Sequence, residues 1–299
     1  MPYVFASRQT FCSKLFRFAD NSCMSTSSTT PQTLAFIGGG NMASAIIGGL
    51  MKQGTPASQI CVVEPFEETR ERLNRQLGVR VLAAADASLA QADLVIWAIK
   101  PQIFKQVAEQ TRAFCTHALH LSVAAGIRSD SIAAWLGTER VVRAMPNTPA
   151  LVGLGQTGLF ARTAVSKTDQ AWVEQVIATT GALMWVKDEP LLDAVTAISG
   201  SGPAYVFFFI EAMVEAGVKM GLTTEQATQL SIGTFEGASQ LAKSANEPPS
   251  VLRERVTSKG GTTYAALNAL QNTHVRELFQ AALEAAQQRA HELGDEFGA

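Results

Sequence analysis

The feature that most constrains the fold of this chain is a glycine-rich loop near its N-terminus. An apolar run of strand type, residues 33–37, leads into the pattern G-x-G-x-x-A at residues 38–43. A helical pattern with small residues follows at 44–50, and a second strand-like run follows at 60–64. This order predicts a dinucleotide-binding βαβ unit. The alternative is a glycine-rich turn between strand and helix that binds nothing.

Several positions of this unit have expected roles. Gly38 makes the tight turn, and Gly40 lets the backbone approach a pyrophosphate. Glu64 ends the second strand, where an acidic residue typically binds the ribose hydroxyls of NAD, whereas NADP sites prefer a small polar residue or a nearby arginine. Arg70 and Arg72 follow on a helix that could carry them away. The sequence therefore leans weakly towards NADH, with NADPH tolerated.

Strand and helix patterns alternate from residue 33 to about residue 188. A continuous apolar run, as at residues 94–99, is expected of a parallel strand buried on both faces. Further strand-like runs lie at residues 119–125, 141–145, 158–162 and 183–187, with a helix at 169–180. Residues 33–188 are therefore predicted to form a Rossmann-type, doubly wound parallel sheet.

Two loops follow strands of this predicted sheet, at the edge where such sheets bind ligands. Lys100-Pro101 comes directly after one strand, and Pro146-Asn147-Thr148-Pro149 comes directly after another. The two prolines of the second loop hold Asn147 and Thr148 in a fixed, non-helical pose, from which they could bind nicotinamide or substrate. A rigid turn without a ligand is the alternative.

The strand patterns then stop, and residues 189–299 are predicted to form a helical domain. Pro203 suits the first turn of a long helix, and Thr223-x-x-Gln226 is typical of a capping box for the next one. The region is rich in Ala, Gly and Leu, and roughly a hundred residues are too few to bury all of its helix faces. We therefore expect it to pair with the same region of a second subunit.

A second glycine turn lies far along the chain, at Val256–Thr263. It reads Val-Thr-Ser-Lys-Gly-Gly-Thr-Thr and leads into a helical pattern at residues 264–270. A helix start leaves backbone N–H groups unpaired, glycine lets a ligand approach, and hydroxyl groups donate hydrogen bonds. The turn is thus predicted to cradle a small carboxylate. The alternative is a plain joint between two helices.

Composition excludes several classes of protein. The net charge of −2 gives no electrostatic footprint for nucleic acid or a membrane surface, and no apolar run reaches transmembrane length. The strongly apolar residues 205–210 are followed by Glu211 and Glu215 and are expected to lie in a buried helix. The chain is therefore predicted to bind neither nucleic acid nor membrane.

Cysteine usage favours a reducing compartment, because the four cysteines show no paired framework. A cytoplasmic location is expected. Cys115, His117 and His120 lie close together in sequence, but no further ligand cluster accompanies them. No metal site is predicted.

Residues 1–32 are predicted to be a disordered extension. They are rich in Ser and Thr and hold three basic residues and one acidic residue. That composition is typical of a transit peptide. A start codon assigned too far upstream explains it equally well, because Met24 stands just before the globular pattern.

Five motifs together resemble those of pyrroline-5-carboxylate reductase. They lie at residues 36–42, 98–101, 143–149, 199–205 and 256–263, and the resemblance covers residues 33 to about 292 in the family's order. It implies hydride transfer from NADPH or NADH to the C=N bond of 1-pyrroline-5-carboxylate, giving L-proline in the last step of proline biosynthesis. It also implies homodimers intertwined through the helical domain, often assembled into larger rings.

The resemblance also implies roles for individual residues. The pyrophosphate would be held by Gly38, Gly40, Asn41 and Met42, the rest of the cofactor would lie beside Ala98, Lys100 and Pro101, and Asn147 would sit near the nicotinamide. The substrate carboxylate would be held by Ser258, Gly260, Gly261 and Thr262, and the Thr263 hydroxyl would reach the ring nitrogen as the catalytic donor. Thr263 could also be a helix N-cap. Two departures from the family pattern are Lys259, where many members have proline, and Glu64, which is unlike NADPH-preferring members.

Two other functions remain open at this point. A dehydrogenase of the β-hydroxyacid type also joins a Rossmann domain to a helical one, but usually relies on a helical-domain lysine. Lys219 and Lys243 are present, and neither lies in a ligand-like context. A non-catalytic dinucleotide sensor would need the first glycine loop and would have no use for the second.

Overall fold

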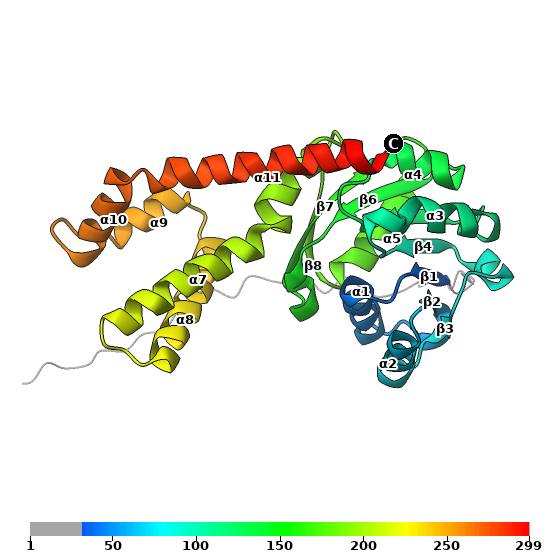
Figure 1. Cartoon of the computed structure of the whole chain (residues 1–299), viewed down its shortest axis with the longest axis horizontal. Helices are drawn as coiled ribbons and strands as arrows, with labels where there is room; N and C mark the ends of the chain where they lie inside the picture. The colour runs from blue at the N-terminus through cyan, green and yellow to red at the C-terminus, as the bar shows by residue number, and fades with distance from the viewer. Residues whose placement is uncertain (1–31, 299) are drawn as a thin grey trace, which may run out of the picture. The chain divides into compact units, whose positions relative to one another are not determined.

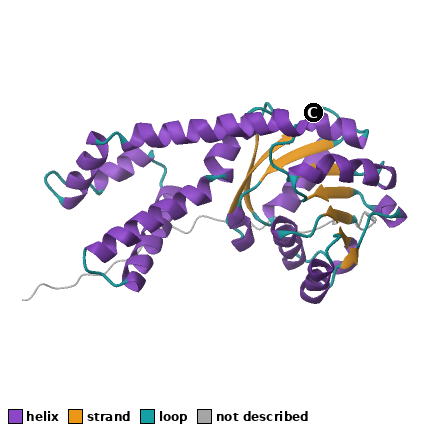
Figure 2. Cartoon of the chain, in the orientation of Figure 1, coloured by secondary structure: helices purple, strands orange, loops and turns teal. Residues whose placement is uncertain are grey.

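One sheet of eight strands organises the N-terminal part of the protein (Figures 1 and 2). This computed structural model describes residues 32–298, so the predicted extension lies outside the described residues except for Gln32. The strand order is β3-β2-β1-β4-β5-β6-β7-β8. The strands are β1 (Leu34–Ile37), β2 (Ile60–Val63), β3 (Arg80–Leu82), β4 (Leu94–Trp97), β5 (Leu119–Ser122), β6 (Val141–Met145), β7 (Gly155–Ala161) and β8 (Gly181–Trp185).

The first six strands are parallel, and the last two run the other way. β6 and β7 pair antiparallel, with Met145 opposite Gly158, and β8 is parallel to β7. This corrects the wholly parallel sheet expected from the sequence. The physical reason is the short connection between β6 and β7, which holds only the 3-10 helix η4 (Thr148–Val152), whereas a parallel return needs a crossover of a dozen or more residues.

Helices cover both faces of the sheet, as the sequence predicts. The helices of this region are α1 (Asn41–Lys52), α2 (Glu67–Leu77), α3 (Pro101–Thr111), α4 (Ser129–Leu136) and α5 (Lys167–Ala178), and 3-10 turns η1 (Ala57–Gln59), η2 (Ala87–Gln91) and η3 (Arg112–Phe114) complete it. One core contains Ile47 of α1 and Val173 of α5, and the other contains Phe104 of α3 and Ile132 of α4. The doubly wound fold is therefore confirmed.

Only helices follow β8 in the described chain (Figure 2). They are α6 (Leu191–Val195), the π-helix η5 (Thr196–Gly200), α7 (Gly202–Lys219), α8 (Thr224–Ser244), α9 (Pro249–Arg255), α10 (Thr262–Asn272) and α11 (Val275–Gly298). Pro203 lies in the first turn of α7. At the start of α8, the Thr223 side chain accepts from the Gln226 N–H and the Gln226 side chain accepts from the Thr223 N–H, which completes the capping box. We call α7 to α11 the helical arm.

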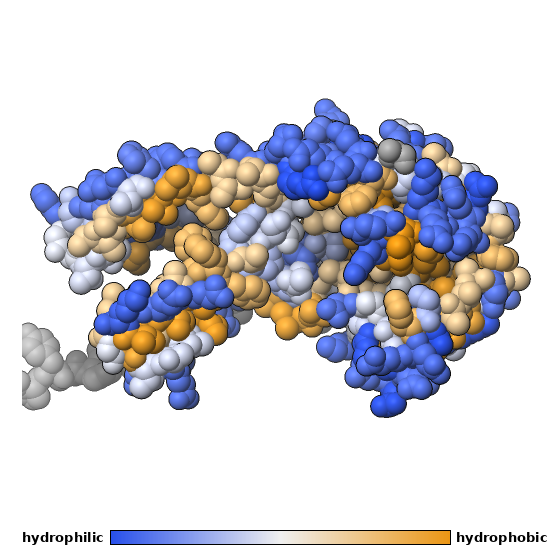
Figure 3. All heavy atoms as spheres, in the orientation of Figure 1, coloured by the Kyte–Doolittle hydropathy of each residue, from blue (hydrophilic) through white to orange (hydrophobic). Residues whose placement is uncertain are grey.

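The helical arm leaves much apolar surface uncovered. α6, η5 and α7 form one continuous helix, Leu191–Lys219, whose most apolar window has a mean hydropathy of 1.4 and is only 6% buried. By length and composition alone this helix could cross a membrane, so the expectation that no apolar run has this length was wrong. The expected burial of residues 205–210 was also wrong for one chain, because Phe207 and Phe208 are 61% and 65% exposed. Figure 3 shows apolar surface over the arm.

Candidate functional site

The first glycine loop joins β1 to α1 at the carboxyl edge of the sheet. Gly38 has a φ of +95°, a region that side chains disfavour, and a Cβ there would lie 2.5 Å from the carbonyl oxygen of Ala98. The Gly38 N–H donates to the Val63 carbonyl over 2.8 Å. The loop is therefore held between the ends of β2 and β4, and the structure brings Gly38 and Ala98 together as predicted.

α1 begins with unpaired backbone donors. Gly40 is its N-cap residue, no side chain caps the helix, and the first bond to Gly40 comes from the Ser44 N–H over 2.9 Å. Within residues 32–298, no group accepts a hydrogen bond from the backbone N–H of Asn41, Met42 or Ala43. A Cβ on Gly40 would meet no protein atom within 4 Å. Free donors at the positive end of a helix dipole, with open space beside them, fit a pyrophosphate.

Glu64 lies beneath this loop and is only 6% exposed. Its Oε2 accepts a hydrogen bond from the Gly39 N–H over 2.8 Å, and its Oε1 accepts one from the Phe66 N–H over 3.0 Å. Each carboxylate oxygen has a second lone pair, which can accept from a ribose hydroxyl. The same carboxylate places a negative charge where the 2′-phosphate of NADP would lie.

Arg70 and Arg72 point back towards the loop, so the expectation that α2 carries them away was wrong. Arg70 Nη1 donates to the carbonyls of Glu64 and Pro65, over 3.0 and 2.6 Å. Arg72 Nη2 donates to the Gly39 carbonyl over 3.0 Å. Nothing in the sequence spacing shows this, because it depends on how α2 packs against the sheet. Two positive charges therefore lie on the same side of the loop as Glu64.

The two loops that follow β4 and β6 complete this edge. Lys100 is the exposed N-cap residue of α3 and Pro101 occupies its first turn. Asn147 is buried, and its side-chain amide is already used. Its Nδ2 donates to the Ser199 carbonyl over 3.0 Å, and its Oδ1 accepts from the Gln156 N–H over 2.8 Å. Asn147 thus fixes the rigid loop to η5 and β7.

The second glycine turn connects α9 to α10. Gly260 has a φ of +75°, which favours glycine, and a Cβ on Gly261 would lie 2.6 Å from Ser258 Oγ, so a side chain there would force Ser258 to move. Gly261 is the N-cap residue of α10, and no side chain caps this helix. Thr263 is the second residue of α10, so it is not the N-cap residue that the alternative required.

The turn presents several free donors to solvent. The first backbone hydrogen bond of α10 runs from the Ala265 N–H to the Gly261 carbonyl over 3.1 Å. In the described part of the chain, the N–H groups of Thr262, Thr263 and Tyr264 have no acceptor. Ser258, Lys259 and Thr262 are exposed. The arrangement is suited to a small anion such as a carboxylate.

The two glycine loops of one chain lie far apart. Figure 1 shows α9 and α10 at the far end of the helical arm from α1. The predicted cofactor residues lie at the carboxyl edge of the sheet, in and around the first loop; they are Gly38, Gly40, Asn41, Met42, Glu64, Ala98, Lys100, Pro101 and Asn147. The second gathers the predicted substrate residues Ser258, Gly260, Gly261, Thr262 and Thr263. One chain therefore does not bring the two sets together.

Two of the three residues considered for a metal site, Cys115 and His120, lie in the core, and His117 is exposed. Burial raises the pKa of the Cys115 thiol to about 11. Trp97 Nε1 donates to His120 Nδ1 over 3.0 Å, and burial lowers the pKa of His120 to about 4. Among residues 32–298, no group of three or more His, Cys, Asp or Glu side chains could hold a metal ion.

Comparison with known proteins places the chain in a family. The model for pyrroline-5-carboxylate reductase dimerisation matches residues 189–293, and that for coenzyme F420-dependent NADP oxidoreductases matches residues 33–126. The pyrroline-5-carboxylate reductase of Pseudomonas aeruginosa is 44% identical over 272 residues, which span 90% of this chain and 99% of that protein. 

Solved structures agree with the sequence comparison. The reductase from Coxiella burnetii has a TM-score of 0.83 at 38% identity and covers 88% of this chain and 99% of that one. The NADP-bound enzyme of Plasmodium falciparum has a TM-score of 0.78 at 28% identity and covers 88% and 98%. On this identity and coverage, the chain belongs to the pyrroline-5-carboxylate reductase family.

Proposed function

We propose that this protein reduces 1-pyrroline-5-carboxylate to L-proline, with NADH or NADPH as the hydride donor, and so performs the last step of proline biosynthesis. The observation that carries the proposal is the presence of two anion-binding backbone sites in a chain of this family. One is the start of α1 and the other is the turn at residues 258–263. A dinucleotide sensor would have no use for the second site.

The first site suits the cofactor. The free N–H groups of Asn41 and Met42 would hold the pyrophosphate, and Glu64 would accept from the adenosine ribose. Ala98, Lys100 and Pro101 would line the cofactor, with Asn147 fixing the loop beside the nicotinamide. When bound, the nicotinamide supplies the hydride.

The second site suits the substrate. Backbone N–H groups at the start of α10, with the Ser258 hydroxyl, would hold the carboxylate, and the Thr263 hydroxyl would donate to the ring nitrogen. Because the imine can arrive already protonated, no strongly basic side chain is needed, and orientation with hydrogen bonding does the work. Lys259, exposed in the same turn, adds a positive charge beside the carboxylate.

The distance between the two loops supports an active site shared between two chains. In a homodimer paired through the helical arm, the turn of one chain would approach the cofactor loop of the other. This pairing also covers the exposed apolar face of Leu191–Lys219, which we assign to a second copy rather than to a membrane. Larger rings would be built from such dimers.

Cofactor preference follows from opposing charges. Glu64 disfavours a 2′-phosphate, whereas the guanidinium groups of Arg70 and Arg72 lie near enough to offset part of that repulsion. We therefore propose that NADH is preferred and NADPH accepted. A NADPH catalytic efficiency well above that for NADH would contradict this preference.

We propose a cytoplasmic location and no nucleic-acid partner. The net charge of −2 supports the absence of a nucleic-acid partner. The free cysteines of the described residues, Cys61 and Cys115, support the location. N-terminal sequencing of the native protein, with cell fractionation, tests the location and distinguishes a transit peptide from an upstream start.

The activity is tested by following NADH oxidation with pyrroline-5-carboxylate. Tight NADH binding without turnover would favour a sensor, and turnover of a β-hydroxyacid instead would favour the other dehydrogenase class. Thr263→Ala should lose about ten- to a thousandfold in turnover with unchanged NADH affinity. Unchanged turnover would remove Thr263 from the mechanism.

Mixed dimers test the shared site. Gly40→Asp places a negative side chain against the pyrophosphate, and Thr263→Ala removes the donor, so each variant alone should lose about tenfold or more in turnover. If the site is shared, random mixing should restore about a quarter of the sites, because half the dimers are mixed and each then has one intact site. A mixture that stays inactive would place both loops in one chain's site.

A further inference from the structure

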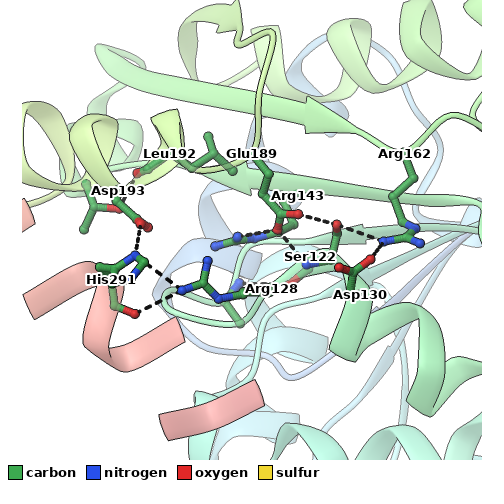
Figure 4. A network of polar contacts seen from close by, with 12 residues as sticks. Ser122, Arg128, Asp130, Arg143, Arg162, Glu189, Leu192, Asp193 and His291 are labelled. Carbon is green, nitrogen blue, oxygen red and sulfur yellow. Dashed lines mark hydrogen bonds and ion pairs between the residues drawn. The ribbon is translucent and has the colours of Figure 1, made fainter. Parts of the chain in front are cut away.

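Three consecutive residues at the start of α4 bind three different parts of the chain. Arg128 binds α11 at His291, and Asp130 binds Arg162 just after β7 (Figure 4). Ser129 binds Glu189 at the base of the helical region. We call Arg128-Ser129-Asp130 the junction. Neither the sequence motifs nor the proposed chemistry uses these residues.

Glu189 joins the junction to the sheet. Its carboxylate accepts from the Ser129 N–H over 2.6 Å and from the Ser129 hydroxyl over 2.5 Å. Arg143 of β6 donates to the same carboxylate over 2.6 Å, and both side chains are largely buried, at 9% and 16% exposed. A carboxylate at a helix N-terminus, paired with a buried arginine, is a strong and directional contact. It fixes the point where the chain leaves the sheet two residues before α6.

Arg128 joins the junction to the other end of the helical arm. Its Nη2 donates to Asp295 Oδ1 over 2.8 Å and lies 3.4 Å from the His291 carbonyl. The guanidinium lies flat against α11, because a Cβ on Gly294 would be only 3.0 to 3.1 Å from its atoms. The Ser131 hydroxyl adds a bond to the Gly298 carbonyl over 3.1 Å. The last turns of α11 are thus fixed to α4.

Asp130 makes the junction itself rigid. It pairs with Arg162, which also donates to Ser129 Oγ over 3.2 Å and to Glu139 over 2.7 Å. Arg162 directly follows β7, so these bonds connect the start of α4 and the residues just after it to the end of β7. The start of α4 cannot shift without breaking several charged contacts.

These contacts lie at the base of the helical arm. α6, which precedes the arm, packs against α11, the last helix of the arm. Glu189, two residues before α6, and Asp295 of α11 both bind the start of α4. α11 has 24 residues, so it spans about 36 Å at 1.5 Å per residue. A rotation of about 3° at its fixed end moves its far end, beside α10, by about 2 Å. A misplacement of about 1 Å at a reacting centre can cost a hundredfold in rate.

We propose that the junction positions the substrate turn, by setting the angle at which each chain extends its helical arm towards the cofactor loop of a second copy. Arg128, Ser129 and Glu189 are positioning residues that touch neither ligand. The inference rests on the shared active site proposed above. It predicts that junction variants lose affinity for the substrate while cofactor binding stays intact, because the cofactor loop lies wholly within the sheet region.

The sharpest variant is Gly294→Ala in the full-length protein. The added methyl group would lie 3.0 to 3.1 Å from the Arg128 guanidinium, which must then shift by a few tenths of an ångström. Alanine favours a helix more than glycine does, so α11 itself is not weakened. The KM for pyrroline-5-carboxylate should rise about tenfold or more, with the NADH Kd from fluorescence titration and the dimer mass unchanged. An unchanged KM would overturn the proposal.

Arg128→Met removes the same contact from the other side and should raise KM in the same way. Arg289→Met is the matched control, since Arg289 also forms ion pairs along α11, with Glu292 and Glu296, but away from the junction. The charge exchange Arg128→Glu with Asp295→Arg should restore part of the lost affinity. If Arg289→Met raises KM equally, α11 stability and not the junction is responsible.

The outcomes separate this inference from the proposed function. A wild-type protein without activity on pyrroline-5-carboxylate contradicts the proposed function before any variant is made. An active wild type whose junction variants keep a normal KM contradicts the positioning role alone. A junction variant that loses NADH affinity in proportion to its KM also contradicts it, because the arm does not carry the cofactor loop.

Discussion

Glu64 serves two purposes through one buried carboxylate. It supports the glycine loop through the Gly39 N–H, and it places a carboxylate where we propose that the adenosine ribose binds. The neutral Glu64→Gln variant should shift the ratio of NADPH to NADH affinity towards NADPH by about tenfold, since removing one close charge repulsion is worth roughly 1.4 kcal/mol. Fluorescence titration of both cofactors measures it.

The control for this change is Glu67→Gln, an exposed acid in the first turn of α2. It should alter both affinities little. Equal weakening of NADH and NADPH binding by Glu64→Gln would show that Glu64 only supports the loop. The position of Glu64 after a strand was readable from the sequence, but its bond to Gly39 was not, because it joins residues 25 apart.

His120 makes stability depend on pH. Burial lowers its pKa to about 4 in the folded protein, from the ordinary value of 6.5. As pH falls from 6.5 towards 4, the unfolded chain binds a proton that the folded chain does not, so stability is fully present above that window and declines within it. The expected loss is on the order of 3 kcal/mol.

Denaturant unfolding at pH 7.5 and pH 4.5 measures this loss. His120→Asn cannot titrate, and its side-chain oxygen can still accept from Trp97 Nε1, so it should show a smaller difference between the two pH values than wild type. His117→Asn is the control, because His117 is exposed nearby. An identical pH difference in wild type and His120→Asn would exclude His120 as the cause.

At the scale of elements, the turn between α9 and α10 depends on glycine. Gly261→Ala brings a methyl group within 2.6 Å of Ser258 Oγ, so Ser258 or the start of α10 must move. The KM for pyrroline-5-carboxylate should rise about tenfold or more with NADH affinity unchanged. Gly233→Ala in α8, where a Cβ meets nothing within 4 Å in one chain, is the matched control. A normal KM for Gly261→Ala would favour the plain helix joint.

Elements with local signals could be predicted from sequence, and those that depend on distant partners could not. The capping box at Thr223 and the proline at 203 mark helix starts through contacts within four residues, and both are correct. β3 (Arg80–Leu82) was missed because three residues carry too little periodicity. The direction of β7 was wrong because strand direction is set by the length of the connection and not by the strand's own residues.

At the scale of the whole molecule, the sequence predicted two ligand sites and a self-pairing helical region but misjudged burial. Residues 205–210 were expected to be buried because apolar helices usually are. In one chain they are not, because the helical arm has too few neighbours to cover them. The same feature explains why the two glycine loops, each readable alone, do not meet within one chain. In the homodimer that we propose, both the burial of this face and the assembly of the site come from a second copy, which no local pattern describes.

The exposed face of α7 gives the most direct test of that second copy. Phe208 is 65% exposed in one chain, so Phe208→Glu should leave the fold of the single chain intact while placing a charge in the dimer interface. We expect a monomer by light scattering, with NADH affinity retained and turnover lost, because the cofactor loop lies in one chain and the substrate turn would come from the other. Ile103→Glu, at an exposed position on α3, is the control and should stay dimeric and active. A Phe208→Glu monomer with full turnover would mean that one chain can bring its own two loops together.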